Sequence, residues 1–210
     1  MSGTPALAPD RPSPAPEARP APRPRFLPTV VVSLAILVVV LGGFVVAWAL
    51  GGRAASRVDV AGLVRVRPAD GWALASRGTL HGPWETGGGT VGEVRFARLT
   101  RGSASLDVSV VAGFEGTPQD LARWYASEVL SRQLTQLVVS DVRAADAIAT
   151  DGLAIRFAYL GIDDGAIEGY VSVVVSLRGT GVVFDAWAEQ GSLAPSLDAV
   201  VEMMARAEVA

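Results

Sequence analysis

The sequence has no cysteine, no lysine and no asparagine, and its 210 residues include a single histidine. Without cysteine the chain has no disulfide, no thiolate metal site, no cysteine nucleophile and no lipoprotein anchor. Without asparagine it has no acceptor for N-glycosylation, and one histidine beside no cysteine argues against a zinc site. All 18 basic residues are arginine. Because lysine and asparagine both have A-rich codons, their absence indicates a GC-rich bacterial genome.

Proline is scarce over most of the chain but concentrated in residues 1–28, which hold nine of the 13 prolines. Because proline lacks an amide donor and has a fixed φ, this stretch favours extended polyproline II structure over a packed core. We predict a disordered Pro/Arg-rich tail. The alternative is a Pro-rich docking motif, for example at 9–12.

Charge is absent from residues 29–50, a run rich in valine and leucine between Arg25 and Arg53. At a rise of about 1.5 Å per residue, a helix over this run is about 30 Å long, the thickness of the hydrocarbon core of a bilayer. The run therefore predicts a transmembrane helix. A cleaved signal peptide is the alternative, because residues 47–49 resemble a small-x-small cleavage site, although signal peptides usually have apolar regions of only about 7–15 residues.

Arginine is almost equally frequent on the two sides of this run, so the positive-inside rule does not by itself give the orientation. Long domains cross a membrane largely regardless of their charge. We therefore predict a cytoplasmic tail and an extracytoplasmic domain on the bacterial plasma membrane, joined by a short tether at 51–57. Gly43, Ala47 and Gly51 share one face of the predicted helix and offer a small-residue contact for a homodimer.

The formal net charge of −3 combines a tail of +2 with −5 on the residues that follow the apolar run. An acidic domain argues against a nucleic-acid partner, because neutralising phosphates requires a basic face. The partners that we expect are the membrane itself and either an envelope protein or a hydrophobic ligand.

Alternation of apolar and polar residues predicts strands in the remainder of the chain. In 103–111, alanine, leucine and valine alternate with serine and aspartate, and 153–160 alternates similarly. The run 168–178 follows an Asp-Gly turn signal, so we expect it to form an antiparallel hairpin with 153–160. Further strands are predicted near 60–66, 72–77, 93–99, 137–142 and 182–188.

Two helices are predicted among these strands. Thr117, Pro118 and Asp120 provide an N-cap, a proline at N1 and an acid at N3, which is close to a capping box. From Leu197 to Met204, apolar residues recur at the i, i+3, i+4, i+7 spacing of an amphipathic helix. The order of strands, helix, strands and helix predicts an α+β domain over 58–210, with an antiparallel sheet flanked by helices.

The segment 64–72 is a strand that runs into a Pro-x-x-Gly-Trp turn. Together with the mid-chain helix, the hairpin and the last strand and helix, it resembles the PsbP/Mog1-like family over about residues 58–210. The resemblance implies one antiparallel sheet with helices on both faces, an α/β/α sandwich. It implies no functional residues, because members range from photosystem subunits to a Ran-binding protein and actinobacterial envelope proteins. Many of the envelope proteins are lipoproteins, whereas this chain has no cysteine and carries an apolar run.

Several motifs resemble sites without completing them. His81 lies in a predicted loop, and the chain has no Gly-x-Ser-x-Gly nucleophile elbow. Residues 87–92 match Gly-x-Gly-x-x-Gly, but a strand follows them where a nucleotide site requires a helix, so we interpret them as a flexible loop. Asp163, Asp164 and Glu168 lack the number and spacing of calcium ligands. We predict no catalytic, metal or cofactor site.

Two weaker candidates remain. Trp84 lies in a predicted Gly/Pro loop, where an indole is either packed down or exposed to a ligand, and it is our candidate ligand-binding residue. Glu168 and Asp185 would be neighbours if their strands pair, with Arg156 beside them. A cross-strand ion pair is one interpretation, and a carboxylate pair for glycoside hydrolysis is the other.

These patterns predict a single-pass membrane protein whose extracytoplasmic domain binds a partner and has no catalytic activity. The partner is expected to be an envelope protein or a hydrophobic ligand held between sheet and helix. One alternative is a cell-envelope hydrolase that uses Glu168 and Asp185. Another is a membrane-tethered regulator that faces the cytoplasm.

Overall fold

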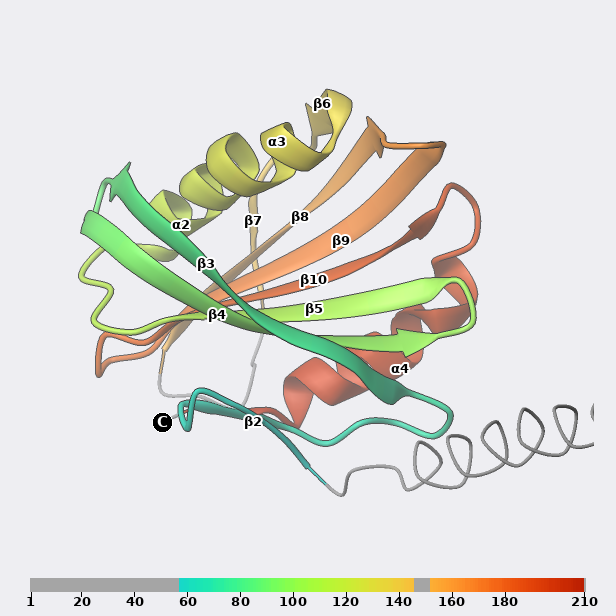
Figure 1. Ribbon diagram of the computed structural model, residues 1–210, viewed down its shortest axis with the longest axis horizontal. Coiled ribbons are helices and arrows are strands. Elements are labelled where there is room, and N and C mark those ends of the chain that lie inside the picture. The colour runs from blue at the N-terminus through green and yellow to red at the C-terminus, as the bar shows by residue number, and fades with distance from the viewer. Residues whose placement is uncertain (1–56, 146–151, 210) are drawn as a thin grey trace, which may run out of the picture. The chain divides into compact units, whose positions relative to one another are not determined.

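The computed structural model describes residues 57–145 and 152–209 (Figure 1). The predicted tail and transmembrane helix, with its small residues Gly43, Ala47 and Gly51, lie outside these ranges. Only the last residue of the predicted tether falls within them. In the described ranges no helix is long and apolar enough to cross a membrane.

One antiparallel sheet forms the middle of the domain (Figure 1). Among the described residues it has eight strands, in the spatial order β3-β4-β5-β10-β9-β8-β6, with β7 paired to β8. Its strands are β3 (Ala73–Thr86), β4 (Gly89–Arg101), β5 (Ala104–Val111), β6 (Thr135–Val139), β7 (Arg143–Ala144), β8 (Leu153–Ile162), β9 (Ala166–Val175) and β10 (Gly181–Glu189). A smaller sheet contains β1 (Val58–Val60), β2 (Val64–Val66) and β11 (Glu208–Val209).

The predicted hairpin is confirmed. Strand β8 pairs antiparallel with β9, from Leu153 opposite Val175 to Ile162 opposite Ala166. The turn between them contains the Asp-Gly signal seen in the sequence, because aspartate and glycine tolerate the backbone conformations of a tight turn.

The mid-chain helix begins as its sequence predicts. Thr117 caps α2 (Pro118–Trp124), and its side chain and that of Asp120 form a reciprocal capping box. The helix continues as the π-helical segment η1 (Tyr125–Leu130) and the short α3 (Ser131–Gln133). The last helix, α4 (Ala194–Ala205), agrees with the predicted amphipathic repeat.

Helices cover both faces of the large sheet (Figure 1). We call the face packed against α2 and η1 the α2 face and the opposite one the α4 face. The core on the α2 face includes Trp84, Trp124 and Tyr125. The core on the α4 face includes Phe184 and Met203 and extends to the small sheet. The predicted α+β fold with an antiparallel sheet between helices is therefore confirmed for the described residues.

Candidate functional site

Polar side chains gather on the α2 face where β5 and β10 pair in the middle of the sheet. Asp107 of β5 lies directly opposite Asp185 of β10. The two residues are 8% and 3% exposed. Alternation along the two strands points both side chains to the α2 face. Because both strands are central and helices cover this face, these side chains lie in the interior. A buried carboxylate requires an ion pair or hydrogen bonds to remain charged there.

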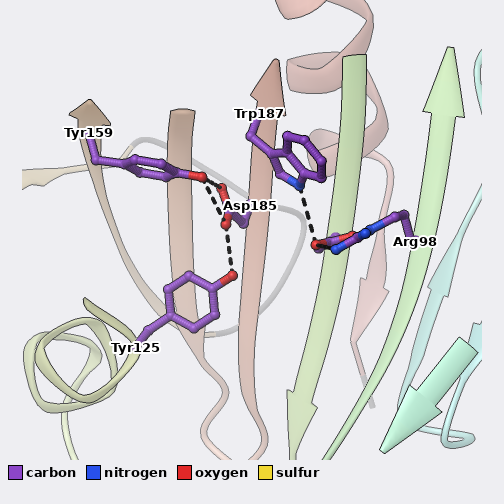
Figure 2. Close-up of polar contacts among 6 residues, drawn as sticks. Arg98, Tyr125, Tyr159, Asp185 and Trp187 are labelled. Carbon is purple, nitrogen blue, oxygen red and sulfur yellow. Dashed lines mark hydrogen bonds and ion pairs between the residues drawn. The ribbon is translucent and has the colours of Figure 1, made fainter. Parts of the chain in front are cut away.

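Asp107 is held in an ion pair with Arg98 of β4. Nε and Nη2 of Arg98 donate hydrogen bonds to the two carboxylate oxygens at 2.6 and 2.7 Å, the bidentate geometry that suits a planar guanidinium. Nε1 of Trp187 donates to the same carboxylate at 3.3 Å. The Arg98 guanidinium also lies 5.1 Å from the centroid of the Trp187 ring, within cation–π range. The side chains of Arg98, Asp107 and Trp187 are therefore all in contact with one another (Figure 2).

Asp185 is held by two tyrosines (Figure 2). The hydroxyl of Tyr125 donates to Oδ2 at 2.8 Å, and that of Tyr159 lies 3.1 Å from Oδ1 and 3.3 Å from Oδ2. Tyr125 opens η1, whereas Tyr159 belongs to β8, so the carboxyl group joins the helical layer to the sheet. Segments of π-helix are frequent at functional sites.

Burial raises the pKa of Asp185 to about 7, and the nearby charge of Asp107 contributes to the increase. Hydrogen bonds from the two tyrosines and the charge of Arg98 oppose that shift. Burial also raises the pKa of Tyr125 and of Tyr159, so both phenols remain protonated donors. The hydrogen bond to Asp107 raises the pKa of Arg98. The charge of Asp185 therefore changes near neutral pH. We call the six residues Arg98, Asp107, Tyr125, Tyr159, Asp185 and Trp187 the polar group.

A cavity of about 430 Å³ lies beside Asp185, and we call it the polar cavity. Its volume falls within the range of small-molecule sites, about 300–1,000 Å³. Besides members of the polar group, its lining contains Gln133, Leu134, Asp163 and Ile167. In residues 57–145 and 152–209, no three His, Asp or Glu residues come together to hold a metal ion.

A second hollow, of about 450 Å³, lies on the α4 face between β6, β8, β9 and the start of α4. Val138 and Leu160 line it and remain 65% and 47% exposed. Leu193 and Leu197 form the side toward α4. Glu168 also lines it, and its carboxylate accepts a hydrogen bond from the Leu193 amide at 2.8 Å. We call this hollow the apolar groove.

The prediction that Trp84 lies in a Gly/Pro loop is wrong, and of the two placements considered for its indole the structure shows the packed one. Trp84 belongs to β3, because the Gly82-Pro83 step interrupts pairing with β4 without ending the strand. Its ring is buried against Trp124, with the centroids 5.7 Å apart in an edge-on arrangement. Trp84 is therefore part of the core. His81 is also in β3 rather than in a loop, and it lies exposed opposite Glu93.

The glycine run at 87–92 forms a hairpin turn and the first residues of β4 instead of a flexible loop. A Cβ atom on Gly88 would overlap the backbone of Gly116, just before α2. A Cβ on Gly87 would overlap the Asp120 carboxylate. Close packing against the start of α2 therefore accounts for two of these glycines without a phosphate ligand.

The predicted pairing of Glu168 with Asp185 is also wrong, although β9 and β10 are neighbours. Glu168 lies opposite Ala188, whereas Asp185 lies opposite Val171, three positions away. Because alternate residues of a strand face opposite sides, Asp185 points to the α2 face and Glu168 to the α4 face. Arg156 is exposed and pairs in register with Ser172, which places it on the α4 face as well.

Most of the polar group escapes sequence reasoning. Asp107 stands on the polar side of the alternating run 103–111, which ordinarily indicates a solvent-exposed face. Tyr125, Tyr159 and Trp187 occupy apolar positions of their elements and indicate core. One signal was present: Asp185 is the one charged residue in the run 182–188, whose other residues are apolar, as is typical of a strand buried on both faces.

No family model matches the chain, and no curated protein shows a significant match. Among solved structures, the chain is similar to the solution structure of cyanobacterial PsbP (CyanoP) from Synechocystis sp. PCC 6803. The two share 14% sequence identity over 73% of this chain and 91% of that chain, with a TM-score of 0.46. This similarity concerns the fold alone.

Proposed function

We propose that the chain is a single-pass membrane protein whose extracytoplasmic domain binds a hydrophobic ligand in the apolar groove and catalyses no reaction. The observation that carries this proposal is the groove itself, where large apolar side chains of β6 and β8 stay exposed beside α4. Adjoining exposed apolar side chains are typical of binding surfaces, because leaving them in water is unfavourable.

The ligand that fits best is a single alkyl chain. The groove lies between sheet and helix, and its volume of about 450 Å³ is in the small-molecule range. Its lining is mostly apolar, with valine and leucine side chains beside Tyr170. Glu168 places one carboxylate in this lining, which gives a polar ligand group a hydrogen-bond acceptor there.

Binding of dodecan-1-ol to the detergent-solubilised chain, measured by displacement of anilinonaphthalene sulfonate, tests this function, because the hydroxyl of this alcohol can donate to the Glu168 carboxylate. Leu160→Asp places a charge in the groove and is expected to weaken binding at least tenfold. Leu177→Asp is the matched control, because Leu177 is also an exposed leucine, 82% exposed, and does not line the groove. Equal binding by the two variants would contradict the proposal.

The location rests on the charge-free run at 29–50 and the basic tail before it. Because the chain has no cysteine, single cysteines can be labelled without background. We expect Ser103→Cys, in the exposed turn between β4 and β5, to react with an impermeant maleimide in intact cells. Ser13→Cys, in the tail, should react only after permeabilisation. The opposite pattern would support a regulator that faces the cytoplasm.

The hydrolase alternative needs two carboxylates that reach one ligand. Glu168 and Asp185 face opposite sides of the sheet. Asp107 lies opposite Asp185, but Arg98 and Trp187 already bind its carboxylate. Binding is therefore the better supported function.

A further inference from the structure

Asp185 is a buried carboxyl group at the wall of the polar cavity, and none of the described cations is paired with it. Its hydrogen-bond partners are two neutral phenols, and the described residues include no ion pair to Asp185. The nearest candidate, Arg98, is engaged by Asp107. A carboxyl group buried this deeply must either carry a proton or be neutralised by a positive charge.

The electric field at Asp185 favours a positive charge. Asp107 raises the pKa of Asp185 more strongly than Arg98 lowers it, so the ion pair of these two residues acts on Asp185 as a net negative charge. Asp163, in the turn after β8, adds a second acid to the lining of the polar cavity. A cation that enters the cavity therefore meets attraction in spite of the nearby guanidinium.

The remaining lining fixes the kind of cation. Oδ1 of Asp185 accepts a hydrogen bond from Tyr159, and a carboxylate oxygen has two acceptor sites, so one site remains for a ligand N–H. Leu134, Ile167 and Trp187 provide apolar wall. A divalent metal is disfavoured, because the described residues offer no group of three ligating side chains there.

We propose that the polar cavity binds a primary ammonium group carried on a short apolar stem, with the Asp185 carboxylate as its counter-ion. This site is on the α2 face and is independent of the ligand proposed for the apolar groove. Arg98 and Asp107 act as a preformed pair that sets the local field, and the stem lies against the aliphatic and indole wall.

Binding is coupled to the loss of a proton from Asp185. Its titratable and charged neighbours are Tyr125 from η1, Tyr159 from β8, Asp107 from β5, Arg98 from β4 and Asp163 from the turn after β8. The raised pKa values of the two phenols and of the guanidinium keep the charges of these three groups unchanged between pH 6 and 8. With a pKa of about 7 for Asp185, its ionised fraction increases about tenfold from pH 6 to 8. An alkylamine stays protonated over this range, as lysine does with its pKa near about 10.4. We therefore expect about tenfold tighter binding at pH 8.

The test is calorimetric titration of the full-length, detergent-solubilised chain with butylamine, and with butanol as the neutral probe of similar shape. We expect saturable binding of butylamine, about tenfold tighter at pH 8 than at pH 6, and at least tenfold weaker binding of butanol. Asp185→Asn should abolish both the preference and the pH dependence. Glu202→Gln removes one negative charge from the exposed side of α4, far from the polar cavity in sequence and outside its lining. This variant should bind butylamine like the wild type.

Ile167→Trp provides a second variant that keeps the carboxyl group but fills the cavity, and it should weaken butylamine binding at least tenfold. If Asp185→Asn does not fold, this variant tests whether butylamine binds in the polar cavity. Leu160→Asp in the apolar groove should leave butylamine binding unchanged. Failure of the proposed hydrophobic ligand site and failure of the ammonium site can therefore be told apart. Equal binding of butylamine and butanol, no saturable binding, or binding that is independent of pH would overturn the proposal.

Discussion

The two faces of the large sheet are made by the same strands but have different chemistry. On the α4 face, β5 and β10 contribute aliphatic and aromatic side chains, among them Leu106, Val108 and Phe184. On the α2 face the alternate positions of these strands include Asp107 and Asp185. Both faces are buried. A polar alternation in a strand that is covered on both faces therefore corresponds to a buried polar group, whereas in a sheet with one uncovered face the same pattern corresponds to a solvent-exposed side.

The largest expected effect belongs to the apolar face. Phe184→Ala removes a fully buried ring from the α4 face of β10 and should lower the free energy of unfolding by about 3–5 kcal/mol, because it loses burial and leaves a cavity. Urea denaturation followed by tryptophan fluorescence measures the loss. It should be the same at pH 5 and pH 8, since no titratable group is involved; a strongly pH-dependent loss would show that the two faces are coupled.

On the α2 face, stability should depend on pH through Asp185. The folded-state pKa of about 7 lies above the unfolded value of 3.8, so the folded chain binds the extra proton and the contribution is lost as pH rises through 7. Between pH 5 and 8 the free energy of unfolding should decrease by about 2–3 kcal/mol from this group. Asp185→Asn should remove that part of the slope. Asp198→Asn, exposed on α4 and outside the polar cavity, is the control and should retain it.

The tyrosines that hold Asp185 should have a smaller effect. Tyr125→Phe removes one donor to a buried carboxylate and should cost about 1–2 kcal/mol at pH 8, where the carboxylate is charged. Since these hydrogen bonds lower the pKa of Asp185, the variant should also move the pH transition upward. Tyr159→Phe and the double variant complete a cycle. Strict additivity of the two losses would mean that the phenols do not act through the shared carboxyl group.

Local sequence signals predicted much of the fold. The capping box at Thr117, the alternation in 153–160 and the Asp-Gly turn each specify structure through neighbouring residues, and each is found. The position of a strand within the sheet is a long-range property. The alternation in 103–111 therefore predicts a strand but not its burial on both faces.

Predicting the candidate site requires the same long-range information, namely which residues of two paired strands lie opposite each other. Whether Asp185 meets Glu168 or Asp107 is decided by register, since a shift of one residue exchanges the faces of a strand. The sequence predicts that Glu168 and Asp185 are neighbours on the condition that their strands pair. The strands do pair, but in a register that separates the two residues. In the same way, Gly82-Pro83 predicted a loop around Trp84, because local turn signals do not reveal that pairing with β4 resumes beyond them.

The smallest expected effect on stability is on the α4 face itself, outside its core. Leu160 faces the same side of the sheet as the core residues of that face, yet it is 47% exposed in the apolar groove. Leu160→Ser should therefore change the free energy of unfolding by less than about 0.5 kcal/mol, as expected for a surface substitution, while it weakens dodecan-1-ol binding several-fold. Denaturation and binding are measured on one preparation, with Phe184→Ala as the reference. A loss of stability approaching that of Phe184→Ala would mean that Leu160 contributes to the core, and the groove would then be a packing defect of that face rather than a binding surface.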